Sequence, residues 1–529
     1  MLALLLALQV AQNPLAQRAD TAVPVHDALH YDITLILPDS GSTIIGQVET
    51  AWRIGGVEPL AIDLDSVLSV KWLRTPGQDG AVGPWRREGG RIVLPHRLAP
   101  GDTLVTRIRY TGAPRTGLIF STDSSGRRVV FADNWPDQAR GWFPSHDYPG
   151  DKATAAFHVE VPAGQLVRAN GVLTKVDTLA GGRTVWHYRI REPIPTYTMV
   201  VGVAPFAVTP LGQAGCPMKC VPQSAWTFPA DSSWAVDGPF RRANEMVDLF
   251  SRQFGSFPYE ELSHVQAVTR YGGVENAGAI WYDHKAVANH TLSERTVAHE
   301  TGHQWFGDAV TEGDWHHLWL SEGFATYLAA LWAEQAGGDS ALATAMSRAA
   351  NTVFKAKETE RPILDFEATD LMGLLNANNY PKGSWVLHSL RGLVGDSTFF
   401  AGMHTYYERF RNGNALSSDF AAVMSEAAGQ DLTWYFLQAL TQPGYPDLAV
   451  RWTQAGDSLT LTVRQMQGPA WGTYRMPGLE FLVDGRLLRA DIEGRETVVS
   501  FHSFIAPPRS IQVDPNGWWL LKARVGDGG

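Results

Sequence analysis

Two histidines and a glutamate stand close together in the stretch VAHETGHQWFGD, residues 297–308. On a helix, His299 and His303 are one turn apart and point to the same side, so both imidazoles can reach a single metal ion. Paired histidines of this kind are typical zinc ligands. The pattern also arises by chance on surface helices, so further residues are needed to support a metal site.

A third ligand is expected from the stretch WLSEGFATY. A catalytic zinc site has three protein ligands, often including a carboxylate, and leaves a fourth position for water. Glu322 follows His303 far enough along the chain to allow a turn and a second, antiparallel helix. The sequence therefore predicts one zinc ion per chain, held by His299, His303 and Glu322. His316 and His317 fit this spacing poorly, so we assign them to structure or surface.

Glu300 lies beside the first histidine on the same expected helix. Zinc lowers the pKa of a bound water to about 7, and a nearby carboxylate can take the proton from that water. The carboxylate can then return the proton to a leaving amine. An ordinary solvated carboxylate is the commoner fate of a glutamate, but it does not explain this position. We therefore expect Glu300 to be a general base.

The helix that carries these residues has an expected start and end. Thr291 followed by Glu294 fits a capping box. Gly307, directly after Phe306, fits the end of a helix. We therefore predict a helix that begins near Thr291 and ends at about Phe306.

Three kinds of sequence pattern follow one another along the chain. Residues 25–205 contain short alternating strands, such as YDITLILP, in which Tyr31, Ile33 and Leu35 share a face. Residues 235–440 have helical spacing, and strands return after TQPGYP. The predicted segments are a signal peptide or disordered N-terminus over 1–19, a β domain over 20–207, a catalytic domain over 208–441 and a second β domain over 442–529.

The composition is that of an ordinary globular protein, with 44% hydrophobic and 19% charged residues. The net charge of −10 argues against a nucleic-acid partner, because such binding depends on Lys and Arg that neutralise phosphates. The 19 Trp residues could form carbohydrate platforms, but indoles spread along a chain are more often part of the core.

The apolar run from Leu2 to Leu8 has the length of a signal-peptide core, although no basic residue precedes it. It predicts a secreted, periplasmic or cell-envelope protein, with the cytoplasm as the alternative. No later segment is expected to span a membrane. Cys216 and Cys220 are too few for a structural zinc site. They form a local disulfide if the chain is exported and remain free thiols if it is cytosolic.

Four motifs, taken in order, are similar to those of a known enzyme family. YGGVENAGAI (271–280), HETGHQWFGD (299–308), WLSEGFA (319–325) and YPKG (380–383) resemble the zinc aminopeptidases that include aminopeptidase N and the leukotriene hydrolase type. The resemblance implies a multidomain α+β fold with an N-terminal β-rich saddle domain, a thermolysin-like, mostly α catalytic domain and a C-terminal β-sandwich domain. Many relatives add a C-terminal helical domain, which we do not expect here.

In that family a Gly-x-Met-Glu-Asn motif binds the substrate, and its glutamate holds the free α-amine. The matching residues here are Gly272, Gly273, Val274, Glu275 and Asn276, with Val in place of Met. The resemblance thus implies that Glu275 binds the amine of the substrate. An anchored carboxylate would attract the terminal ammonium and place the first peptide bond over the metal. A simple turn is the alternative interpretation of this stretch.

Other site residues are also implied by the resemblance. Tyr380 matches the family tyrosine that stabilises the oxyanion of the tetrahedral intermediate, and Lys382 and Gly383 match as structural residues. The family's N-terminal domain usually supplies a Gln or Glu to the amine site. The corresponding stretch here contains Asp133 and Asn134, which are the candidates for completing that site.

The residues and the resemblance together predict a zinc aminopeptidase that acts on peptides with a free N-terminus. A zinc endopeptidase is the alternative enzyme, but it leaves the GGVEN motif unexplained. A catalytically silent binding protein is a second alternative, although such proteins usually lose metal ligands or the base first. A serine hydrolase would need a Gly-x-Ser-x-Gly elbow, which the sequence lacks. Epoxide hydrolysis, known in one branch of the family, is compatible with the same motifs. The preferred N-terminal residue and the oligomeric state are not indicated.

Overall fold

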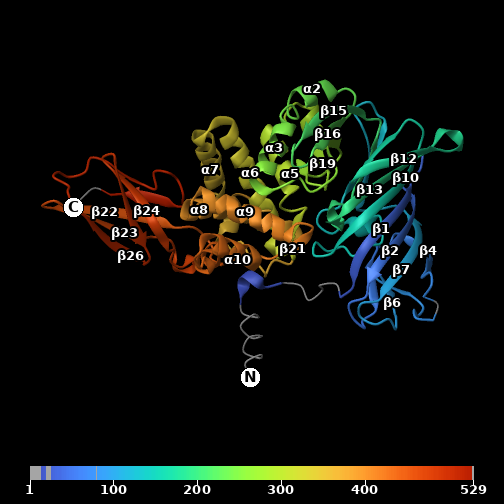
Figure 1. Cartoon of the computed structure of the whole chain (residues 1–529), viewed down its shortest axis with the longest axis horizontal. Helices are drawn as coiled ribbons and strands as arrows, with labels where there is room; N and C mark the ends of the chain where they lie inside the picture. The colour runs from blue at the N-terminus through green and yellow to red at the C-terminus, as the bar shows by residue number, and fades with distance from the viewer. Residues whose placement is uncertain (1–12, 19–24, 79, 527–529) are drawn as a thin grey trace. The chain divides into compact units, whose positions relative to one another are not determined.

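The computed structural model describes residues 13–18, 25–78 and 80–526 (Figure 1). Most of the expected signal peptide, including the apolar run from Leu2 to Leu8, lies outside the described residues. Among the helices that are described, none is both long and apolar enough to cross a membrane.

The described chain divides into two compact units. The first unit comprises residues 18–315 and 407–415, and the second comprises residues 316–406 and 416–526 together with residues 13–17. The predicted catalytic segment 208–441 therefore contributes to both units. Each unit is described by itself below.

The largest sheet of the first unit forms from the alternating segments near the N-terminus (Figure 1). Its order is β12 (Val172–Thr178), β13 (Thr184–Pro195), β10 (Lys152–Val161), β1 (Asp27–Ile36), β2 (Ile44–Arg53), β7 (Thr103–Gly112) and β4 (Ser69–Arg74). In β1, the side chains of Tyr31, Ile33 and Leu35 are buried while their neighbours are not, which confirms that these three share the core face.

Two smaller sheets complete the β-rich part of the first unit. One has the order β11 (Leu166–Ala169), β14 (Val201–Ala204), β9 (Arg128–Asp133) and β8 (Gly117–Thr122). The other has the order β3 (Leu60–Asp63), β6 (Arg91–Leu94) and β5 (Arg86–Glu88). The N-terminal part is thus built of strands, as the sequence predicts.

A five-stranded sheet with helices follows in the same unit. Its order is β15 (Ala207–Ala214), β16 (Val221–Thr227), β17 (Leu262–Ala267), β19 (Ala279–Asp283) and β18 (Gly273–Val274), so the short strand β18 lies at an edge. Its helices are α2 (Ser232–Asp237), α3 (Ala243–Phe254), α4 (His284–Ala288) and α5 (Glu294–His303). A two-stranded parallel sheet pairs β20 (Val310–Glu312) with β21 (Gly413–Ala415). A disulfide joins Cys216 to Cys220 in the connection between β15 and β16.

The helices of the second unit are packed closely where two glycines meet. The helices are α6 (Trp319–Gly337), α7 (Asp339–Val353), α8 (Gly383–Val394), most of α9 (Asp396–Phe410), α10 (Ser417–Ala428) and α11 (Thr433–Thr441). A Cβ added to Gly323 of α6 would lie 2.9 Å from the Cα of Gly383, the first residue of α8. The two glycines therefore let these backbones approach more closely than any side chain would allow.

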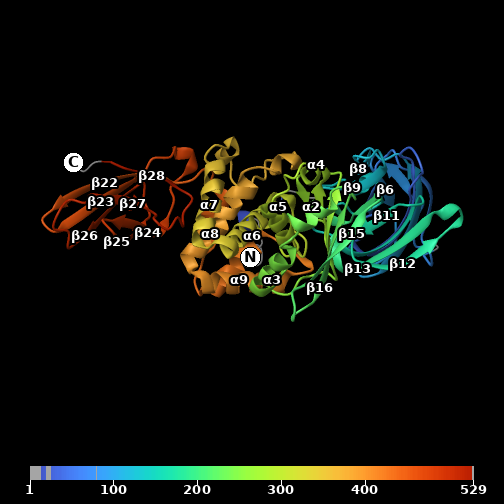
Figure 2. The same cartoon turned by 90° about the horizontal axis from the view of Figure 1, so that it is seen from above.

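The C-terminal strands of the second unit form two sheets that share one core (Figure 2). The first has the order β26 (Glu496–Phe501), β23 (Ser458–Gln465), β22 (Asp447–Ala455) and β28 (Lys522–Val525), and the second has the order β25 (Arg486–Ile492), β24 (Met476–Val483) and β27 (Ile511–Val513). Leu461 and Val463 from one sheet and Leu479 and Phe481 from the other are fully buried in that core. This is the β-sandwich that the sequence predicts after residue 442.

Residues 13–17 differ from the expectation that the first 19 residues are a leader or a disordered N-terminus. Pro14–Ala16 form a 3-10 helix, and Leu15 is buried. The carbonyl oxygen of Gln17 lies 2.7 Å from Nε2 of His317. A buried leucine and a hydrogen bond tie these residues to the second unit, so they are not disordered here, while the signal peptide over 1–19 stays a prediction.

Candidate metal and substrate site

Helix α5 carries both histidines and begins later than the sequence suggests. Its N-cap is Ser293, whose side chain accepts a hydrogen bond from the backbone N–H of Thr296. The N–H of Thr291 donates to the carbonyl oxygen of Ala286, so Thr291 still belongs to the turn after α4. The predicted capping box at Thr291 is therefore wrong. The helix ends at His303, before the predicted end at Phe306.

The two histidines of α5 face each other. Their Nε2 atoms lie 3.1 Å apart, and their ring planes are 87° to one another. Nδ1 of His303 lies 3.2 Å from the carbonyl oxygen of Phe306. Because a carbonyl only accepts, this bond places the ring proton on Nδ1 and leaves the Nε2 lone pair for a metal. Helical spacing thus brings the two ring nitrogens together, as predicted.

Glu300 and the edge strand β18 are in direct contact. A Cβ added to Gly273 would lie 2.5 Å from the carboxylate carbon of Glu300 and closer still to its Oε1. Glu300 is buried, with 5% of its surface exposed. The glycine therefore allows the strand backbone to pass directly over this carboxylate, where any side chain would displace it.

The loop after β18 holds Glu275 in a buried position. Val274, Glu275 and Asn276 are all less than a tenth exposed, whereas Gly272 is exposed. The turn is closed by the N–H of Ala279, which donates to the carbonyl oxygen of Asn276 at 2.9 Å. The stretch is thus a turn as well as a candidate binding loop.

A buried glutamine that the sequence analysis missed connects this loop to α5. Nε2 of Gln304 donates to the carbonyl oxygen of Glu275 at 2.8 Å, and Oε1 of Gln304 accepts from the N–H of Gly278 at 2.8 Å. Its position directly after His303 was the only signal in the sequence. Neither its residue type nor its spacing indicates that contact.

Glu322 and Tyr380 lie together in the second unit. Glu322 is in the first turn of α6 and is 5% exposed. Tyr380 is in a π-helical turn, Asn378–Lys382, that leads into α8. The hydroxyl of Tyr380 donates to Oε1 of Glu322 at 2.7 Å. The close approach of Gly323 and Gly383 brings these two elements within reach of each other.

Asp133 and Asn134, the candidates for completing the amine site, are engaged in structural contacts. Asp133 accepts from the backbone N–H of Arg270 at 3.1 Å and from its guanidinium at 3.0 and 3.1 Å. Asn134 donates to the carbonyl oxygens of Thr196 and Met199 and accepts from the indole of Trp142. Both residues are at most 2% exposed. We therefore do not keep either of them as an amine ligand.

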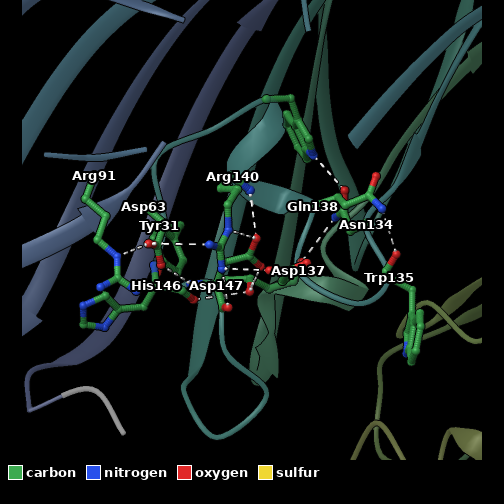
Figure 3. Close-up of polar contacts among 12 residues, drawn as sticks. Tyr31, Asp63, Arg91, Asn134, Trp135, Asp137, Gln138, Arg140, His146 and Asp147 are labelled. Carbon is green, nitrogen blue, oxygen red and sulfur yellow. Dashed lines mark hydrogen bonds and ion pairs between the residues drawn. The ribbon is translucent and has the colours of Figure 1, made fainter. Parts of the chain in front are cut away.

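The chain around Asn134 belongs to a larger network of polar side chains, some buried and some partly exposed (Figure 3). The backbone N–H and Nε of Arg140 both donate to Oδ2 of Asp147, at 3.0 and 3.1 Å. Nε of Arg91 donates to Oδ1 of Asp63 at 2.8 Å. Burial raises the pKa of the Asp147 carboxyl to about 6. These contacts stabilise the β-rich part of the first unit.

His316 and His317 have structural partners. Nε2 of His316 lies 2.9 Å from the carbonyl oxygen of Ala368. Nδ1 of His317 lies 2.8 Å from the hydroxyl of Ser417. This agrees with their assignment to structure.

The donor set fits zinc. In the described part of the chain, His299, His303 and Glu322 are a group that could hold a metal ion. Two imidazoles and one carboxylate are a common set of ligands for a catalytic zinc ion. The Nδ1 bond of His303 and the Tyr380 hydroxyl on Glu322 are the kind of outer contacts that orient metal ligands.

Two family models match the chain, and they decide the family. The peptidase M1 N-terminal domain matches residues 28–198, and the peptidase family M1 domain matches residues 240–438. The chain belongs to peptidase family M1. The match to the peptidase family M1 domain, residues 240–438, contains the motifs around Glu275, His299 and Tyr380.

Relatives within the M1 family are named aminopeptidases. The chain is 27% identical to aminopeptidase N of Streptomyces lividans over 463 residues, which is 78% of this chain and 52% of that protein. It is 26% identical to human glutamyl aminopeptidase over 351 residues, which is 63% of this chain and 36% of that protein. The chain thus spans about half the length of the Streptomyces relative and less of the human one.

Solved structures of the M1 family have the same fold. A crystal structure of an M1 zinc metallopeptidase from Deinococcus radiodurans aligns with a TM-score of 0.70 at 26% identity, over 80% of this chain and 94% of that one. A mutant of the Deinococcus protein bound to a Tyr-Ser-Ala substrate aligns with a TM-score of 0.68 at 26% identity, over 80% of this chain and 95% of that one. The multidomain α+β fold expected from the sequence is confirmed.

Proposed function

We propose that this M1 protein is a zinc-dependent aminopeptidase that removes the N-terminal residue of peptides. The proposal is supported by membership of the M1 family and by the aminopeptidase names of its relatives. The single observation that carries it is the hydrogen bond from Nε2 of Gln304 to the backbone carbonyl oxygen of Glu275, because Gln304 directly follows His303 and so ties the loop of this acidic residue to the end of the helix of the candidate zinc histidines. A carboxylate there would select a charged N-terminus.

In this proposal His299, His303 and Glu322 hold the zinc ion. When bound, zinc lowers the pKa of a coordinated water and polarises a carbonyl oxygen. Glu300 takes the proton of the attacking water and passes it to the leaving amine. Its burial beneath the backbone of Gly273 holds the carboxylate in place and limits its access to bulk water.

Two further residues orient the substrate and stabilise the transition state. Glu275 binds the α-ammonium group and thereby places the first peptide bond at the metal. The Tyr380 hydroxyl, which donates to Glu322 in this structure, is the proposed donor to the oxyanion. Gly272, Gly273, Val274 and Asn276 form the backbone wall along which the substrate binds.

The proposal is tested by comparing an aminoacyl anilide with its N-acetylated form. The wild-type enzyme should cleave only the anilide that has a free α-amine. Glu275→Gln should lower kcat/KM for this anilide by about 100-fold, because the substrate ammonium loses its charged partner. Glu300→Gln should lower kcat by about 100- to 10,000-fold while zinc content stays the same. Glu245→Gln on the exposed face of α3 is the matched control and should have no effect. Equal cleavage of the acetylated substrate would favour an endopeptidase instead.

We also propose that the protein is exported. The apolar run from Leu2 to Leu8 and the disulfide between Cys216 and Cys220 support this, because disulfides persist mainly in oxidising compartments. Fusing residues 1–24 to a phosphatase that is active only outside the cytoplasm tests it in a bacterial host. No phosphatase activity in intact cells would contradict export.

A further inference from the structure

The side chain of Gln304 makes three short hydrogen bonds inside the protein, where it is fully buried. Nε2 donates to the carbonyl oxygen of Glu275 and to Oδ2 of Asp308, both at 2.8 Å. Oε1 accepts from the backbone N–H of Gly278, also at 2.8 Å. Gln304 directly follows His303, the last residue of α5. A single side chain thus joins the helix of the candidate zinc ligands to the loop of the candidate amine ligand.

These bonds permit only one orientation of the amide. If the oxygen and nitrogen were exchanged, Nε2 would face the N–H of Gly278 and Oε1 would face the carbonyl oxygen of Glu275. Both contacts would be repulsive. The amide therefore fixes the loop in position and direction, because buried donors and acceptors without partners are costly.

The two loop atoms that Gln304 binds lie at either end of the turn that carries Glu275. From another side, Nδ2 of Asn170 donates to the carbonyl oxygen of Ala277 at 2.9 Å. A guanidinium N–H of Arg168 donates to the carbonyl oxygen of Gly278 at 3.1 Å. The loop is thus held by backbone contacts from the β-rich part and from α5. The side chain of Gln304 joins this loop to the end of the helix that carries the two histidines.

We infer that Gln304 is a positioning residue that sets the distance between the Glu275 loop and the two candidate histidine ligands, His299 and His303. This inference rests on the proposed function of Glu275 as the amine ligand. Gln304 acts through the backbone of the loop and does not touch the substrate. Its loss should therefore weaken recognition of the amine while leaving metal binding intact.

The test measures what the amine contributes to binding at the zinc-loaded site. One probe is leucine hydroxamate, and the other is 4-methylpentanohydroxamate, which is the same compound without the amine. The ratio of their inhibition constants gives the advantage due to the amine. In Gln304→Leu this advantage should fall by about 10- to 100-fold, since small displacements of a positioning group have effects of that size. Binding of the amine-free hydroxamate should be unchanged.

Gln266 provides a matched control. It is fully buried and also makes three side-chain hydrogen bonds, with the N–H of Phe228, with Asp231 and with the carbonyl oxygen of His284. Gln266→Leu should lose a similar amount of stability and keep the full amine advantage. If Gln304→Leu does not fold, Gln304→Glu is used, because it keeps the shape and the acceptor for Gly278 but removes the donor to Glu275.

The outcomes separate this inference from the proposed function. If Glu275→Gln keeps the amine advantage of the wild type, the proposed role of Glu275 fails. If Glu275→Gln loses the advantage but the folded Gln304 variants retain it, only the positioning role is overturned. Equal weakening of both hydroxamates in the Gln304 variants would also overturn it, because Gln304 would then act on the metal ligands.

Discussion

The backbone of Gly273 lies against the carboxylate of Glu300, so close that a Cβ at position 273 would be 2.5 Å from the carboxylate carbon. The neighbouring Gly272 is different, since an added Cβ there would meet no atom within 4 Å. Of the two glycines in the YGGVEN motif, only Gly273 is therefore required by the packing of the site. This requirement can be measured.

Gly273→Ala should displace the Glu300 carboxylate and lower kcat by about 10- to 100-fold, because a general base must lie within hydrogen-bond reach of its proton. Zinc content should not change, since the three atoms nearest to the added Cβ all belong to Glu300, which is not a proposed metal ligand. Gly468→Ala, where an added Cβ would meet no atom within 4 Å and which lies outside the candidate site, is the control and should keep the wild-type kcat. Equal effects of the two substitutions on kcat would show that the contact with Glu300 is not the cause.

Tyr380→Phe removes the hydroxyl that donates to Glu322 at 2.7 Å. If the hydroxyl also serves the oxyanion, kcat at saturating zinc should fall by about 100- to 1,000-fold. Zinc affinity should fall by about 10-fold, because Glu322 loses an orienting bond. Steady-state kinetics and zinc competition measure the two effects separately.

Tyr327→Phe is the matched control for that experiment. Tyr327 lies on the same helix, α6, and its hydroxyl lies 3.2 Å from Nδ1 of His388. Its substitution should leave zinc affinity unchanged. If Tyr380→Phe keeps the wild-type kcat at saturating zinc, Tyr380 does not stabilise the oxyanion and only orients the candidate metal ligand Glu322.

Lys382 should make the stability of the protein depend on pH. It is 5% exposed, and burial lowers the pKa of its ammonium group from 10.5 to about 7. Between about pH 7 and 10.5 the unfolded chain binds a proton that the folded chain does not, so the free energy of unfolding rises with pH. This stabilisation is lost progressively as the pH falls from about 10.5 to about 7, and below that pH both forms of the chain carry the proton.

Lys382→Met should therefore be stabilised relative to the wild type at pH 6, by up to about 5 kcal/mol, and this difference should shrink as the pH rises. Urea unfolding of both proteins at pH 6, 8 and 9.5 measures it. Lys71→Met, at an exposed lysine, should show no such trend. A difference between Lys382→Met and the wild type that does not vary with pH would contradict the prediction.

Local patterns allowed several features to be predicted correctly. The spacing of His299 and His303 brings their ring nitrogens together because helix periodicity fixes the directions of residues one turn apart. The alternation of Tyr31, Ile33 and Leu35 predicts their shared burial for the corresponding reason in a strand. The order of β-rich, helical and again β-rich parts followed from the same periodicities.

Predictions that depended on exact positions were less successful. Thr291 and Ser293 are both good N-cap residues, and the turn after α4 decides between them by using the N–H of Thr291. Asp133 and Asn134 could have been ligands, but Arg270 and Trp142 occupy their polar atoms. Such partners come from distant parts of the chain, so no local pattern reveals them.

The sequence by itself determined the chemistry of the candidate site, since residue type and spacing along one helix specify two imidazoles and the carboxylate of Glu300. Only the tertiary structure decided how that helix relates to the Glu275 loop. Gln304 joins the two through backbone atoms, and Gly273 sets their separation by having no side chain. Backbone contacts of this kind leave little trace in residue identity, because most residue types offer the same N–H and carbonyl groups.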